Sequence, residues 1–70
     1  MTVPDPRAAL RADSPGEALA VFVGWRATLK PKERIFVTMR YQHHRLSNGV
    51  REAIAKTLTE YSHGTNERSE

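Results

Sequence analysis

The chain has 70 residues, of which 39% are hydrophobic, and it contains no cysteine. A chain of this length forms one domain with a small core, and the lack of cysteine excludes disulfides and thiolate metal sites. Eleven Lys and Arg against eight Asp and Glu give a net charge of +3, which favours polyanionic partners. We therefore expect a small basic domain that gains stability from a partner protein or as a homodimer.

The first 13 residues show little apolar patterning and carry Pro4 and Pro6. We predict a flexible, disordered tail over residues 1–13, in which Asp5 and Pro6 can cap a short helical turn. No basic segment precedes an apolar run, so a signal peptide is not predicted. The longest apolar run, residues 18–23, is too short to cross a bilayer. The expected location is the cytoplasm, without membrane contact.

A first helix is predicted from Pro15 to Lys30. Ser14 is a suitable N-cap, and Glu17 lies three residues later, as in a capping box. Pro31 ends the helix, because a residue that precedes proline is disfavoured in the α region. The apolar residues spaced for one helical face are Ala18, Val21, Phe22, Trp25 and Leu29. We expect this face to form the core, with Trp25 as its anchor.

A second apolar strip on this helix consists of Leu19, Val23 and Ala27, on the side opposite the core face. It leaves the helix apolar almost all round, so it must be covered. The N-terminal segment, a second subunit or a protein partner would cover it. We take these three residues as the candidate partner-binding surface.

A second helix is predicted to start at Pro31 and to run to about Gln42 or His43. Residues 34–41 also alternate in a way that suits a β-strand. Helix is favoured because the sequence offers no partner strand for pairing.

The third predicted helix has Ser47 as its N-cap and runs from Asn48 to the region of Tyr61. Val50, Ala53, Ile54, Thr57, Leu58 and Tyr61 recur at helical spacing. Gly64 is expected to end the helix and to begin a flexible tail over residues 64–70. The predicted fold is all-α, a small three-helix domain over residues 14–63 that is helix-turn-helix-like, with disordered termini.

Basic residues cluster in the middle of the chain, where residues 26–56 hold eight cations and two anions. Such a block is typical of a nucleic-acid-binding surface, although solvated helix faces carry similar charge. Asn48 and Arg51 are the candidates for contacts to base edges, because their side chains make paired hydrogen bonds to adenine and guanine. The candidates for phosphate contacts are Lys30, Lys32, Arg34, Arg40, Arg45 and Lys56.

No arrangement of residues in the sequence points to catalysis. The serines fall at predicted caps or in tails, and Glu33 and Glu52 each adjoin an arginine and are interpreted as surface charges. His43 and His44 are adjacent, so on a helix they point in different directions and do not share a metal. We predict no enzyme activity, no cofactor, no metal and no small-molecule substrate.

Residues 17–58 resemble the start of the C-terminal DNA-binding region, region 4, of sigma-70-type factors. The matching residues are Leu29, Pro31, Glu33, Arg34, the run 36–41, Leu46-Ser47, and 52–55 with Leu58. The spacing between Ser47 and Glu52 is longer than in that family, and the recognition helix that enters the major groove is missing. The resemblance implies the scaffold and a contact with RNA polymerase rather than promoter reading.

Residues 35–41 as a strand, followed by 47–54, also resemble parts of a ribbon-helix-helix repressor, but the helix between them is missing. The leading hypothesis is transcription regulation by binding DNA, RNA polymerase or both. The alternative is an adaptor, inhibitor or antitoxin that docks through Leu19, Val23 and Ala27.

Overall fold

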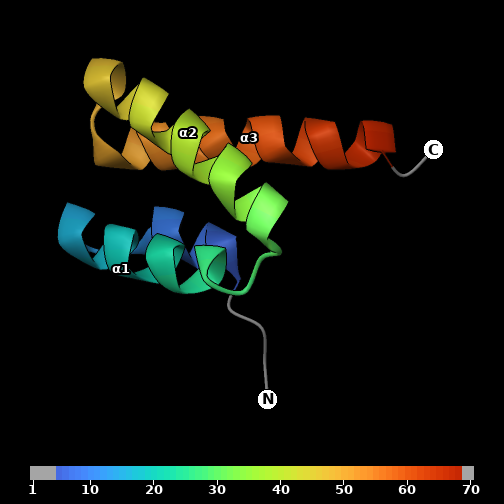
Figure 1. Ribbon diagram of the computed structural model, residues 1–70. Coiled ribbons are helices and arrows are strands. Elements are labelled where there is room, and N and C mark those ends of the chain that lie inside the picture. Colours follow the sequence, from blue (N-terminus) through green and yellow to red (C-terminus); the bar gives the residue numbers. More distant parts are fainter. Residues whose placement is uncertain (1–4, 69–70) are drawn as a thin grey trace.

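The computed structural model describes the backbone of residues 5–68 and the side chains of residues 5–63. A short 3₁₀ helix, η1 (Pro6–Arg11), is followed by the helices α1 (Pro15–Arg26), α2 (Pro31–Asn48) and α3 (Val50–Arg68) (Figure 1). The described part of the chain has no strand, which confirms the all-α prediction and settles residues 34–41 as helix. No helix in this part is long and apolar enough to cross a membrane.

The four elements form two layers. η1 lies against α1, while α3 runs over this pair and contacts both (Figure 1). α2 crosses the view obliquely and packs mainly against α3. The core therefore lies between α1 and the α2–α3 pair, with η1 closing one side.

The N-terminal segment is more ordered than predicted. Asp5 caps η1 by accepting a hydrogen bond from the Arg7 backbone N–H at 3.0 Å. Pro6 fits the first helical position, and Ala9 is completely buried. Residues 6–11 of the predicted tail therefore form the short helix that Asp5 and Pro6 were expected to cap, and the small Ala9 side chain lets η1 approach the core closely. Residues 1–4 lie outside the described residues.

The start of α1 is as predicted, but its end is not. Ser14 Oγ accepts from the Glu17 backbone N–H at 3.2 Å, and Pro15 is the first helical residue. The helix ends at Arg26 rather than Lys30, because the backbone hydrogen bonds donated after Ala27 join residues three apart instead of four. Thr28 N–H donates to the Trp25 carbonyl at 2.9 Å, and the Thr28 hydroxyl donates to the same oxygen at 2.6 Å.

The boundary between α2 and α3 lies at Gly49. We predicted that α2 ends near His43 and that Ser47 caps the next helix, but α2 continues to Asn48 and includes Ser47. Gly49 has φ 81° and ψ 173°, a conformation that only glycine adopts readily. Its carbonyl accepts the first bond of α3, from Ala53 N–H at 2.9 Å.

Replacing Gly49 by alanine is expected to lower the free energy of unfolding by about 1–3 kcal/mol, because the backbone conformation is strained for any L side chain. An added Cβ would meet no atom within 4 Å, so the effect is purely conformational. Gly24→Ala in the exposed middle of α1 is the matched control and should stabilise by about 0.5–1 kcal/mol. Urea unfolding followed by circular dichroism checks both, and equal midpoints for the two variants would contradict the assignment.

The end of α3 also differs from the prediction. Gly64 was expected to stop the helix, but the backbone remains helical to Arg68. A glycine inside a helix costs only about 1 kcal/mol relative to alanine, which is too little to end a helix that is already propagating. The backbone of residues 64–68, which we assigned to a tail, is thus part of α3, and residues 69–70 lie outside the described range.

The core is built on an aromatic cluster. Phe22 is 2% exposed, and its ring centroid lies 5.1 Å from that of Tyr41 and 5.8 Å from that of Trp25. Trp25 meets Tyr61 edge-on at 5.4 Å. The other buried apolar residues are Ala9, Ala18, Val37, Ala53 and Ile54. The expected role of Trp25 as a core residue is confirmed by its exposure of only 6%.

Candidate binding surfaces

Three arginines of the basic block make contacts within the fold. Arg40 Nε lies 3.0 Å from Glu60 Oε1, and its guanidinium lies 5.3 Å from the centre of the Phe36 ring. Arg51 donates to the Ala12 carbonyl at 2.6 Å. Arg26 donates to the Thr38 hydroxyl, also at 2.6 Å. These side chains help to hold the helices together, which reduces their availability for phosphate groups.

The remaining predicted phosphate contacts do not gather on one face. An α-helix has about 3.6 residues per turn, so Lys32 lies on one side of α2 while Arg34 and Arg45 lie on the other. Lys30 precedes α2, and Lys56 belongs to the separate helix α3. The positive charge is therefore distributed around the domain instead of forming one continuous patch.

The two predicted base-edge residues lie on different helices. Asn48 is the last residue of α2 and is half-buried, whereas Arg51 is in the first turn of α3. The shared outward face that we predicted for them on one helix is not formed, because Gly49 separates them. Sequence reasoning placed the helix start at Ser47 and so assigned Asn48 to the wrong element.

The predicted apolar strip on α1 is only partly available as a surface. Leu19 is half-buried and packs against the core. Val23 is 42% exposed, and Ala27 lies beyond α1 as its C-cap. Leu19 contributes to the core, whereas Val23 and Ala27 are exposed, and the Ala27 N–H still donates to the Val23 carbonyl at 3.0 Å.

A larger apolar surface lies on the outward side of α2. Ile35 is 60% exposed, Met39 is 64% exposed and Leu46 is 91% exposed. Their spacing of four and seven residues places them in one row along the helix, opposite the buried Val37 and Tyr41, with the exposed Gln42 between Met39 and Leu46. We call this row, together with its flanking basic residues, the outer α2 face.

Basic groups border the outer α2 face on both sides. Lys32 and His43 lie along one edge, and Arg34 and Arg45 along the other. The only acidic residue of α2, Glu33, points away from the row and accepts a hydrogen bond from the Lys30 backbone N–H at 3.4 Å. Sequence analysis missed this face because it ended the helix near His43, which left Leu46 out.

His44 joins α2 to α3 instead of lying in solvent. Its Nε2 lies 2.7 Å from Glu60 Oε2, and its side chain is 14% exposed. Glu60 thus contacts both His44 and Arg40, one turn apart on α2. The adjacent His43 ring lies 5.2 Å from the His44 ring in an edge-on arrangement. Within residues 5–63, no group of His, Asp or Glu side chains has the arrangement of a metal site.

Comparison of the chain with protein-family models, curated proteins and solved structures finds no match in any of the three. Its function is therefore inferred from the geometry and charge of its own residues.

Proposed function

We propose that this protein is a small helical adaptor that docks on a protein partner through the outer α2 face. The observation that carries the proposal is the row of Ile35, Met39 and Leu46, each more than half exposed on one side of the longest fully described helix. Contiguous exposed apolar side chains bordered by polar residues are typical of protein interaction sites. A row spaced by whole helical turns is suited to a partner helix.

Charge selects the kind of partner. A partner helix with an apolar stripe bordered by Asp and Glu would match the apolar row and would neutralise the basic edges, Lys32, Arg34 and Arg45. A second copy of this chain would bring the same basic edges together, and like-charge contacts oppose such a dimer. The row from Ile35 to Leu46 extends over about 16 Å, roughly three helical turns. The proposed partner therefore presents an acidic amphipathic helix of at least that length.

Transcription regulation through DNA or RNA polymerase is the second candidate. The exposed Lys32, Arg45 and Lys56 favour it, because none of them has a carboxylate partner among the described side chains. The scattered positions of these cations make weak, sequence-independent phosphate contact the expected mode. A polymerase surface with an acidic helix would satisfy both candidates.

The variant Met39→Glu tests the docking proposal. Glutamate keeps the helix intact at an exposed position but places a charge in the centre of the apolar row. We expect affinity for the partner to fall by at least about tenfold, as for a central interface residue. The measurement is affinity capture from the native lysate with wild-type and variant baits, with and without nuclease treatment.

Val23→Glu is the matched control, because it puts the same charge on an exposed residue of α1. A protein that is captured by wild type and Val23→Glu but lost with Met39→Glu supports the proposal. Equal capture by all three baits contradicts it. Loss of the captured protein on nuclease treatment favours the nucleic-acid candidate instead. A dimer in sedimentation that Met39→Glu dissociates would assign the face to self-association.

A further inference from the structure

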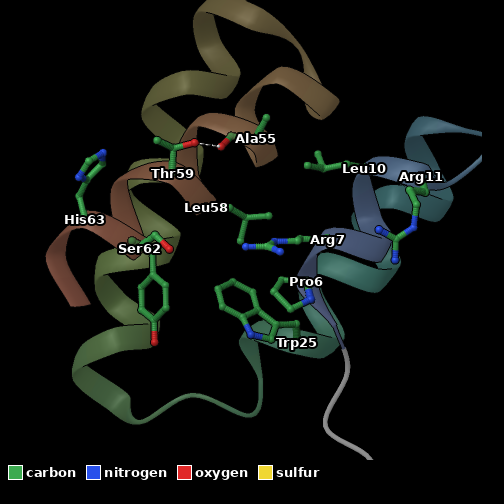
Figure 2. Close-up of a pocket in the computed structure, with 11 residues that line it drawn as sticks. Pro6, Arg7, Leu10, Arg11, Trp25, Ala55, Leu58, Thr59, Ser62 and His63 are labelled. Atoms are coloured by element: carbon green, nitrogen blue, oxygen red, sulfur yellow. Dashed lines mark hydrogen bonds between the residues drawn. The ribbon is translucent and has the colours of Figure 1, made fainter. Parts of the chain in front are cut away.

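A second candidate site lies on the other side of the molecule from α2, between η1 and the C-terminal half of α3. It is an open cavity of ≈ 670 Å³, bordered by Leu10, Trp25 and Leu58 (Figure 2). This size falls within the range of about 300–1,000 Å³ that is usual for small-molecule sites. Trp25 therefore serves both as a core residue and as part of the cavity wall.

The charged side chains that line the cavity, Arg7 and Arg11, are both positive. The polar residues that line it are Arg7, Arg11, Thr59, Tyr61, Ser62 and His63, and among the side chains of residues 5–63 no Asp or Glu lines it. Arg11 lies 3.6 Å from Asp5. Figure 2 shows the Arg7 side chain pointing from η1 into the cavity, between Leu58 and Pro6. Arg7 has no ion-pair partner among the described side chains, so its guanidinium is available to an anion.

We propose that this cavity binds a small amphipathic carboxylate, with the carboxylate on Arg7 and the apolar part against Trp25, Leu10 and Leu58. A guanidinium matches a carboxylate through two parallel hydrogen bonds, which gives both strength and orientation. No carboxylate lines the cavity in the part of the chain whose side chains are described, which disfavours a cationic ligand, and the apolar walls disfavour a fully hydrated anion. We predicted no small-molecule substrate from the lack of a catalytic arrangement in the sequence. The cavity itself is not visible there, because its lining residues come from three separate segments, residues 6–11, Trp25 and residues 55–63.

The test uses decanoate and two probes with the same alkyl chain, decanol and decyltrimethylammonium, at concentrations below micelle formation. Trp25 is the single tryptophan of the chain, so its fluorescence reports directly on the cavity. We expect decanoate to produce a saturable change in emission, decanol to bind about tenfold more weakly, and the ammonium probe to bind more weakly still. Equal affinities for the three probes, or no saturable change with decanoate, would overturn the proposal.

Arg7→Gln is expected to weaken decanoate binding about tenfold while leaving decanol binding unchanged. Lys30→Gln, at the exposed position before α2, removes one positive charge outside the cavity and serves as the control. Amide chemical shifts give the location independently. Decanoate should shift the amide resonances of η1 and of residues 55–63. Shifts confined to the outer α2 face, or an Arg7→Gln affinity equal to wild type, would overturn the assignment. None of these outcomes depends on whether the outer α2 face binds a protein.

Discussion

Phe22→Ala should lower the free energy of unfolding by about 3–5 kcal/mol and leave the chain largely unfolded at room temperature. Phe22 is 2% exposed and lies between the rings of Trp25 and Tyr41, so it joins α1 to α2. Removal of its ring leaves a cavity and takes one ring contact away from each of the two aromatic neighbours. A single core of this size supplies only about 3–5 kcal/mol in total, so the loss is comparable with the whole stability.

Thermal unfolding followed by far-ultraviolet circular dichroism measures this effect. Val23→Ala, one position along α1 and 42% exposed, is the control and should move the midpoint only slightly. A folded Phe22→Ala variant with a midpoint near that of wild type would show that the aromatic cluster does not hold the fold together.

Ile54→Ala is expected to have the second largest effect, about 2–5 kcal/mol. Ile54 is completely buried at the centre of the inner face of α3, the helix that contacts all three other elements. The milder Ile54→Val should cost about 0.5–1.5 kcal/mol, because it removes one methyl group and leaves a smaller void. Urea unfolding of the two variants should therefore give graded midpoints. A cost for valine equal to that for alanine would indicate strain rather than lost packing.

Local signals in the sequence predicted the starts of α1 and α2, but not the start of α3. Ser14 and Pro15 specify the start of α1, and Pro31 specifies the start of α2, because caps and prolines act within one turn of the chain. The apolar residues of α3 predicted its buried side, because their helical spacing is also a local property of the sequence. The helix ends were predicted poorly: Gly49 stops a helix and Gly64 does not, and only the backbone conformation in the folded state distinguishes the two.

The candidate sites depended on information that a single sequence does not display. Arg40 and Glu60 are twenty positions apart, and their pairing follows only from the packing of α2 on α3. The cluster of cations along the sequence suggested one basic surface, but the helical twist of about 3.6 residues per turn places these residues on different sides of the helices. The row of Ile35, Met39 and Leu46 was visible as a spacing, but it required the correct length of α2.

The hydrogen bond from Arg51 to Ala12 joins residues 39 positions apart. Contacts of such long range affect when the chain can fold during its synthesis. η1 and α1 leave the ribosome first, yet Phe22 meets Tyr41 only after α2 has been made, and η1 meets α3 later still. The first half of the protein therefore lacks its core contacts with α2 and α3 until those helices have been synthesised. The core is complete only when α3 is present. We expect a chain that is truncated before α3 to remain unfolded and to be cleaved by proteases.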